Sequence, residues 1–255
     1  MAEIRVHREN DILILTFDNE PKRNAFTYGM TAALGRLLDE AEVDRTVRCV
    51  VLTGSGDKAF SSGHDLNELL VDRDHAASAE LNGPFFRPAS MTTPTIAAVN
   101  GAALAGGLIL ALSCDVRICS QNAVFAAPGA KIGLLPIGGQ LSRLPALLPP
   151  GIAFEVLATA RNFSAEEGQR HGFVNRIVPP DAVLDAALTL ARTIAANSPT
   201  VVASIKRGLD IYLRKGVAAA EQFEWDEGGR LQGGPDADEG VRAFLEKRVP
   251  VFQPQ

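Results

Sequence analysis

The sequence predicts an α/β core followed by a helical tail. In the first 150 residues, apolar segments such as 12–17 and 49–52 have the length and composition of buried strands, and they alternate with helix-patterned segments. Beyond about residue 150 the helical pattern continues and strand-like segments become rare. A run without one charged residue, 88–114, predicts fully buried elements near the middle of the chain. At 255 residues the chain is long enough for a sizeable core.

The individual elements follow from apolar periodicity and from capping residues. Strands are expected at 4–7, 12–17, 49–52, 95–99 and 116–119. Helices are expected at 30–44, 66–82, 106–114, 152–160, from Ser164, at 182–197 and at 198–216. Thr27 is expected to cap the first helix, turns are expected at Asn10-Asp11 and Asn100-Gly101, and residues 59–65 are expected to form a loop. No repeat of fixed period is visible.

The uncharged run raises the question of a membrane span, because about 20 consecutive apolar residues suffice to cross a bilayer. Pro94, Asn100 and Gly101 interrupt this run. It therefore divides more naturally into a buried strand, a turn and a buried helix.

Composition narrows the classes of partner and the compartment. The net charge of −5 provides no basic face for nucleic acid, and no Lys/Arg-rich run suggests a membrane surface. Cys49, Cys114 and Cys119 are odd in number and lie in or beside apolar segments, which favours reduced core thiols and a cytoplasmic location. The first ten residues contain no apolar signal core.

Three familiar motifs fit the sequence poorly. Residues 54–59 match G-x-G-x-x-A after a strand, but no amphipathic helix follows, so a strand-to-loop turn is favoured over a dinucleotide site. Ser61, Ser62, His64 and Asp65 are near neighbours, whereas a hydrolase triad is normally assembled from distant parts of a chain. The four histidines show no metal-ligand spacing.

The glycines suggest a different chemistry. Gly63 precedes His64, and Gly106-Gly107 stand where a helix is expected to begin. Backbone amides at such positions can approach a ligand closely, and the unpaired amides of a helix N-terminus suit a developing oxyanion. Each glycine taken alone is more commonly a turn residue.

The sequence resembles the crotonase superfamily of enoyl-CoA hydratases and isomerases over essentially its whole length. The phrases that carry the resemblance, in order, are PKRNAF, VVLTGSGDKAFSSGHDLNEL, PTIAAVNGAALAGGLILALSCDVRI, FAAPGAKIGLLPIGG and FLEKRVPVF. The resemblance implies the crotonase (ClpP/crotonase-like) α/β fold, a spiral of ββα units over 1–195, with a C-terminal helical trimerisation region over 196–255.

The resemblance also implies roles for particular residues. The backbone amides of His64 and Gly106 match the two donors that hold a thioester oxyanion. Positions that match the coenzyme A path are Lys22, Arg23, Ala25, Ser62, Asp65 and Leu66. Lys22 and Arg23 are reasonable phosphate partners, although exposed basic residues are more often merely solvated. Lys247 and Arg248 are candidates to join them from a neighbouring subunit.

The sequence departs from the family where the family places its acids. The glutamates of typical hydratases match Ile109 and Gly129, and the acid of several isomerases matches Ile137. None of the three can ionise, so two-glutamate hydration is not expected. Candidate substitutes are Asp65, Glu68 and the His64 imidazole. Asp65 has an alternative as a helix cap, and Glu68 has one as part of a solvated helix face. Asp115 is expected to be structural.

Two functions from different classes remain at this stage. The leading hypothesis is an acyl-CoA-processing lyase or isomerase of the enoyl-CoA hydratase/isomerase type, which stabilises a thioester enolate without metal or redox cofactor. Its rival is a non-catalytic acyl-CoA binding protein that has lost the acids at Ile109, Gly129 and Ile137. A structural subunit is a weaker third class. Acyl-CoA is the expected partner, and a homotrimer or a hexamer of two trimers is the expected assembly.

Overall fold

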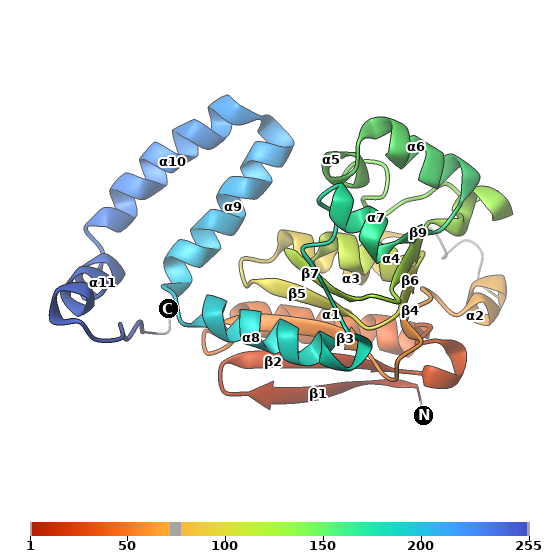
Figure 1. Ribbon diagram of the computed structural model, residues 1–255, viewed down its shortest axis with the longest axis horizontal. Coiled ribbons are helices and arrows are strands. Elements are labelled where there is room, and N and C mark those ends of the chain that lie inside the picture. The colour runs from red at the N-terminus through yellow and green to blue at the C-terminus, as the bar shows by residue number, and fades with distance from the viewer. Residues whose placement is uncertain (1, 72–77, 254–255) are drawn as a thin grey trace.

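The computed structural model describes residues 2–71 and 78–253 and shows an α/β body from which a helical arm extends (Figure 1). The strands of the six-stranded sheet, in their spatial order, are β1 (Glu3–Glu9), β2 (Ile12–Asp18), β3 (Cys49–Gly54), β5 (Thr95–Val99), β7 (Val116–Ser120) and β10 (Arg176–Val178). The strands of the four-stranded sheet, in their spatial order, are β4 (Ala59–Ser61), β6 (Ala102–Leu104), β8 (Val124–Ala126) and β9 (Phe163–Ser164). Only the pairs β1–β2 and β8–β9 are antiparallel among these ladders.

Three successive strand pairs repeat one arrangement. In β3–β4, β5–β6 and β7–β8 the first strand joins the large sheet and the second joins the small sheet. This confirms the predicted spiral of ββα units. The first strands begin at residues 49, 95 and 116, so the repeats differ greatly in length. That inequality explains why no fixed period is visible in the sequence.

The helices confirm most of the sequence expectations. Their bounds are α1 (Tyr28–Val43), α2 (Leu66–Val71), α3 (Ala79–Phe86), α4 (Gly106–Ser113), α5 (Leu144–Leu147), α6 (Pro150–Thr159), α7 (Ala165–Arg170), α8 (Val183–Ala195), α9 (Pro199–Lys215), α10 (Val217–Gln232) and α11 (Pro235–Glu246). The 3-10 helices are η1 (Glu20–Lys22), η2 (Arg87–Ser90), η3 (Pro128–Ile132) and η4 (Pro180–Ala182). As predicted, the Thr27 hydroxyl caps α1 by accepting from the Met30 amide at 3.2 Å.

Two expectations needed correction. The segment 59–65, expected to be a loop, begins with strand β4, and the unpredicted β6 forms directly after the turn at Asn100-Gly101. Three-residue strands are too short to show a period-2 pattern. The single helix expected over 66–82 is wrong, because Ser78 is extended and caps the start of α3, which separates α3 from α2. Residues 72–77 of this expected helix lie outside the described residues.

The large sheet is covered on both faces. Along β3, Val50 and Leu52 pack into the core that contains α1 and α4, whereas Cys49 and Val51 pack against α8. Successive side chains of a strand point to opposite faces, which explains the uninterrupted apolar run of this strand. The result is a core with a helix layer on each side of the sheet.

The uncharged run forms β5, β6 and α4, and every residue of α4 is buried. This confirms the prediction of buried elements. No helix within the described residues is long and apolar enough to cross a bilayer. Cys49, Cys114 and Cys119 are buried and free, and burial raises the pKa of each thiol to about 12.

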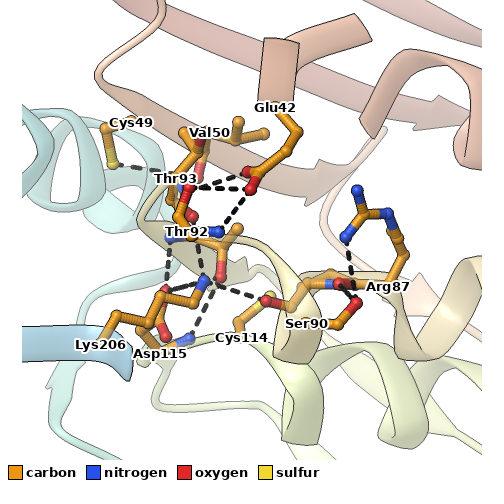
Figure 2. A network of polar contacts seen from close by, with 12 residues as sticks. Glu42, Cys49, Val50, Arg87, Ser90, Thr92, Thr93, Cys114, Asp115 and Lys206 are labelled. Atoms are coloured by element: carbon orange, nitrogen blue, oxygen red, sulfur yellow. Dashed lines mark hydrogen bonds and ion pairs between the residues drawn. The ribbon is translucent and has the colours of Figure 1, made fainter. Parts of the chain in front are cut away.

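A lysine is one of the residues that join the arm, α9 to α11, to the body (Figure 2). Lys206 of α9 donates from Nζ to the carbonyl oxygens of Pro88 and Thr93, both at 2.9 Å, and to Asp115 Oδ2 at 2.8 Å. Asp115 also accepts from the Thr95 amide at 2.7 Å, which supports its expected structural role. The base of the arm is thereby fixed to the segment that enters β5.

Candidate active site

The backbone at His64 is held on one side and left open on the other. The Phe26 amide donates to the Gly63 carbonyl at 2.8 Å, and the Asp65 amide donates to the Phe26 carbonyl at 2.8 Å. This is a parallel bridge in which Phe26 bonds to the residues on either side of His64. The His64 amide therefore points away from Phe26, toward the side that this bridge does not cover.

The second amide lies at the start of α4. Gly106 is the first residue of this helix, and helix N-terminal amides lack intrahelical partners. Ala105, just before it, has φ 48° and ψ −114°, a region that residues with a Cβ rarely adopt. Its amide donates to the Ala126 carbonyl at 3.0 Å and its carbonyl accepts from the Ile109 amide at 3.0 Å. These two bonds hold the strained residue and thereby fix the direction of the Gly106 amide.

The two segments approach so closely that only glycine fits between them. Gly63 has φ +90°, and a Cβ there would lie 2.8 Å from the Gly106 nitrogen. A Cβ on Gly107 would lie 2.2 Å from the Ser61 carbonyl oxygen. The amides of His64 and Gly106 are thus neighbours across a glycine contact, an arrangement that suits two donors to one oxygen.

The residues expected along the coenzyme A path are mostly brought together. Lys22 donates to Asp65 Oδ2 at 2.5 Å, and the Ser62 amide donates to the Arg23 carbonyl at 3.1 Å. Ala25, also in this loop, is buried. Leu66 begins α2 with 64% of its surface exposed. The loop after β2 and the segment after β4 therefore form one surface beside the His64 amide.

The C-terminal basic pair does not join this surface within the same chain. Arg248 is bound to Glu239 and Glu246 of the arm, at 2.6 Å in each case. Lys247 caps α11 in a left-handed conformation.

The three positions that match the family's acids are structurally distinct. Ile109 is 3% exposed in α4, and its side chain fills the space beside Gly138, where a Cβ would lie 2.7 Å from its Cδ1. Gly129 lies in η3, and a Cβ there would lie 2.5 Å from the Leu134 carbonyl oxygen. Ile137 is half-buried in the segment between η3 and α5. None of these three positions carries an ionisable side chain.

The two carboxylates considered as substitutes have structural partners. Asp65 accepts from Lys22 and from the Asn67 amide at 3.0 Å, and the Lys22 hydrogen bond holds its pKa below the usual value. Glu68 Oε2 accepts from the Tyr28 amide at 2.6 Å. Asp65 therefore caps α2 as the sequence suggested, whereas Glu68 contacts the start of α1 instead of being merely solvated.

The His64 imidazole is half-buried against α3. Its Nε2 lies 3.4 Å from Asn82 Oδ1, and its ring meets the Phe85 ring edge-on at a centroid distance of 4.7 Å. Its Nδ1 is buried and has no hydrogen-bond partner among residues 2–71 and 78–253. Burial lowers the pKa of His64, an effect that the Asn82 hydrogen bond partly opposes. Sequence reasoning missed Asn82 and Phe85, because Asn82 is the last residue of the helix expected over 66–82 and Phe85 lies beyond it.

Other motifs have structural explanations. Asn100 accepts from the Gly54 amide at 3.1 Å and donates to the carbonyls of Gly54 and Gly56. The G-x-G-x-x-A match at 54–59 is therefore a turn that the Asn100 side chain stabilises by hydrogen bonds. Ser61 Oγ donates to the Asn24 carbonyl at 2.9 Å and accepts from the Gly63 amide at 3.1 Å. The described residues contain no cluster of three or more His, Cys, Asp or Glu side chains suited to a metal ion.

Comparison with known proteins decides the family. The family model described as enoyl-CoA hydratase/isomerase matches residues 7–255. The chain belongs to this family, and so to the crotonase superfamily. It is 37% identical to a carnitinyl-CoA dehydratase of Citrobacter koseri, with 96% of each chain covered. Among solved structures, an enoyl-CoA hydratase of Bacillus anthracis aligns with a TM-score of 0.94 at 29% identity and covers 99% of both chains.

A second solved relative agrees with this result. An enoyl-CoA hydratase of Mycobacterium marinum aligns with a TM-score of 0.92 at 34% identity over 100% of both chains. Membership of the enoyl-CoA hydratase/isomerase family and these relatives support acyl-CoA processing as the general role of the chain.

Proposed function

We propose that this protein is an enzyme of the enoyl-CoA hydratase/isomerase type that binds an acyl-CoA thioester and stabilises its enolate. The observation that carries the proposal is the glycine contact that makes neighbours of the His64 and Gly106 amides. Two preorganised N–H donors directed at one oxygen stabilise the negative charge that develops when a proton leaves the carbon beside a thioester carbonyl. The N-terminal end of α4 adds the favourable potential of the helix dipole.

The surroundings of the two amides suit an acyl thioester. Phe85 packs against Gly106, because a Cβ on this glycine would lie 3.1 Å from the Phe85 ring. Together with Ile109 it provides apolar walls that exclude water and strengthen electrostatic interactions. On the other side, Lys22 and Arg23 supply positive charge for the phosphates of coenzyme A. The chemistry requires no cofactor beyond the coenzyme A of the substrate.

The missing carboxylates limit the reaction. Hydration needs one group to activate water and another to handle the proton at carbon, whereas enolate formation and return of the proton need only one group. The carnitinyl-CoA dehydratases and enoyl-CoA hydratases that resemble this chain are therefore guides to the class of substrate. The reaction favoured for this chain is proton exchange, isomerisation or epimerisation beside the thioester.

The second candidate is a non-catalytic acyl-CoA binding protein. It is favoured by the three positions that the resemblance matches to the family's acids, because they carry Ile109, Gly129 and Ile137. The Leu134 carbonyl also occupies the space that a side chain at residue 129 would need. A third candidate, a structural subunit without ligand, is opposed by the intact glycine contact at Gly63.

The proposed assembly is a homotrimer or a hexamer of two trimers, with residues 196–255 as the trimerisation region and 1–195 as the core. Large apolar side chains exposed on the arm support this assembly: Ile205, Leu209, Tyr212, Val217, Trp225, Val241, Phe244 and Leu245. Trp225 and Phe244 are 82% and 83% exposed, which is costly unless another subunit covers them. The three reduced thiols support a reducing compartment such as the cytoplasm.

The test is incubation of the purified protein with saturated and trans-2-enoyl-CoA thioesters in heavy water, followed by mass spectrometry. The proposal expects deuterium at carbon well above a protein-free control, and little hydration. Binding without label across the panel would favour the acyl-CoA binding protein. Failure to bind any coenzyme A thioester would contradict both and favour the structural subunit.

A further inference from the structure

We propose that the imidazole of His64, through Nδ1, is the group that removes and returns the proton at the carbon beside the thioester carbonyl. The inference rests on the proposed function and assigns its missing proton-transfer residue. It gives His64 two separate roles: the backbone amide holds the oxyanion and the side chain moves the proton. Two observations carry it, namely the contact between His64 Nε2 and Asn82 Oδ1, and a buried Nδ1 that has no partner among the described residues.

The tautomer follows from a chain of two hydrogen bonds. Asn82 Nδ2 donates to the Ser78 carbonyl at 2.9 Å, and a carbonyl can only accept. This orients the Asn82 amide so that Oδ1 faces His64 Nε2 at 3.4 Å. Because Oδ1 can only accept, Nε2 carries the proton of the neutral ring. Nδ1 is left with a free lone pair and is therefore the basic nitrogen.

The basic nitrogen is buried and otherwise unused. Nδ1 of His64 and Oε1 of Gln140 are the two buried side-chain polar atoms without a hydrogen-bond partner in the described part of the chain. Such atoms are rare in folded proteins, and each calls for an explanation. A proton acceptor that meets its partner only when substrate is bound explains Nδ1. Asp65 and Glu68, by contrast, already accept hydrogen bonds from the folded chain.

Its own backbone and the Phe85 ring link the imidazole to both proposed oxyanion donors. Nδ1 is four covalent bonds from the backbone nitrogen of its own residue, which is one of the two proposed oxyanion donors. The ring packs edge-on against Phe85, and Phe85 in turn lies against Gly106, the other donor. The α carbon of a thioester lies two bonds from its carbonyl oxygen, so an oxygen that accepts from both amides holds that carbon beside the segment that carries the imidazole.

The proposed step balances without a co-reactant. The lone pair of neutral Nδ1 forms a bond to the α proton while the C–H bond breaks, and the electron pair moves into the carbonyl to give an enolate oxygen. The enolate is held by the amides of His64 and Gly106. The imidazolium then returns a proton to the same carbon or to a conjugated one, which restores the neutral ring. Burial keeps the ring neutral near pH 7 by lowering the pKa of His64, as a base requires.

The first experiment measures deuterium exchange at the α carbon of butyryl-CoA and its dissociation constant in the same preparations. His64→Gln keeps the backbone amide and removes the base. Exchange is expected to fall at least about 100-fold, the usual contribution of a general base, with binding within about threefold of wild type. The control is His7→Gln, because His7 lies exposed on β1. Unchanged exchange in His64→Gln would overturn the inference and leave the proposed function standing.

A second variant covers the possibility that His64→Gln disturbs packing. His64→Ala leaves a space for added imidazole, which is expected to restore exchange at least about tenfold over the variant alone, as a positioned base does. If both variants lose binding together with exchange, the side chain serves packing and the inference fails. It also fails if Glu68→Gln abolishes exchange while His64→Gln does not. Wild type that binds without exchange overturns the catalytic part of both proposals, and wild type that does not bind contradicts the proposed function.

Asn82 is a positioning residue in this scheme. A change at Asn82 is expected to shift the pH dependence of exchange, which a loss of packing alone would not do. Among the residues that the structure describes, burial lowers the pKa of His64 and the Asn82 hydrogen bond raises it. Asn82→Asp places a carboxylate against Nε2–H and stabilises the imidazolium, so the pKa of His64 rises. The neutral base is then lost at a higher pH, and the acid limb of the exchange profile is expected to move up by about one pH unit. An unmoved acid limb would contradict the assignment.

Discussion

The candidate site has two walls that differ in how they are built. The donor wall consists of backbone: the amides of His64 and Gly106, which approach each other across Gly63. The acid wall is the name used here for positions 109, 129 and 137, which the family resemblance matches to acids and where this chain carries Ile, Gly and Ile. The donor wall is complete, and the acid wall has no ionisable group.

This difference shows which positions of the candidate site the packing of the fold restricts to one residue type. The donor wall cannot change without a steric conflict, because a Cβ on Gly107 would lie 2.2 Å from the Ser61 carbonyl oxygen in the neighbouring strand. A catalytic carboxylate has no such role in packing. Ile109 shows this directly, since an apolar side chain there fills the core beside Gly138. Under the proposed function, the fold and the two amides therefore persist while a different residue transfers the proton.

The largest expected effect comes from blocking the donor wall. Gly63→Val places a side chain against the Gly106 nitrogen and prevents a carbonyl oxygen from reaching both amides. We expect α-proton exchange of bound acyl-CoA to fall at least about 100-fold, as it does when one oxyanion donor is lost. The control is Gly228→Ala in α10, where an added Cβ meets no atom within 4 Å. Wild-type exchange in Gly63→Val would show that the two amides do not act on the substrate.

A side chain introduced at residue 129 of the acid wall is expected to destabilise the protein. Gly129→Ala brings a Cβ to within 2.5 Å of the Leu134 carbonyl oxygen and should lower the free energy of unfolding by about 1–3 kcal/mol. Urea denaturation measures it, with Gly151→Ala in α6 as the control because nothing lies within 4 Å of its added Cβ. Equal stability of the two variants would mean that the loop after η3 moves to accommodate a side chain at residue 129, and that a glutamate would be tolerated there.

Asp65 offers a test of the neighbouring loop contact. Lys22 holds the pKa of this carboxyl below its usual value, so its contribution to stability is present above the unfolded pKa and is lost as the pH falls through the folded pKa. Asp65→Asn should therefore destabilise the protein by about 1–2 kcal/mol at pH 7. The difference should shrink below about pH 4, the ordinary aspartate range.

The matched control is Asp57→Asn, an exposed carboxyl in the loop after β3. A penalty for Asp65→Asn that stays constant from pH 7 to pH 3 would contradict the ionic contact with Lys22.

The smallest expected effect concerns the residue that aims the Gly106 amide. Ala105 has φ 48°, and glycine adopts this region without steric strain. Ala105→Gly should raise the free energy of unfolding by at most about 1 kcal/mol, since relief of strain is partly offset by the entropy of the unfolded chain. Thermal unfolding measures the change, and Ala196→Gly, at an exposed position of φ −72°, should instead be destabilising. A loss of stability in Ala105→Gly would show that no strain is stored there.

The sequence predicted the elements whose apolar pattern is long and missed those that are short. Helix α1 and strands β3 and β5 were predicted because their apolar pattern spans several residues. Strands β4 and β6 have three residues each, too few to show a period. The small sheet, which carries the segment that leads to His64, could thus be inferred only through the family resemblance.

Parts of the site differ in the same way. The glycines at 63, 106 and 107 suggested backbone donors, but each alone is more commonly a turn residue, and only the family resemblance assigned this role to the amides of His64 and Gly106. The pairing of His64 with Asn82 and Phe85 left no such signal, since these residues are separated in sequence and α3 extends beyond the helix expected over 66–82. Tertiary contacts of this kind are not encoded in any local pattern.

The most direct test of the intact donor wall measures the substrate carbonyl itself. Infrared spectra of butyryl-CoA carrying ¹³C at the thioester carbonyl are recorded free and bound, with Gly63→Val for comparison. Two hydrogen bonds from the amides of His64 and Gly106 withdraw electron density from the carbonyl, so its stretching frequency should fall on binding to wild type. A bound thioester whose frequency equals that in water, while binding is confirmed, would contradict the account.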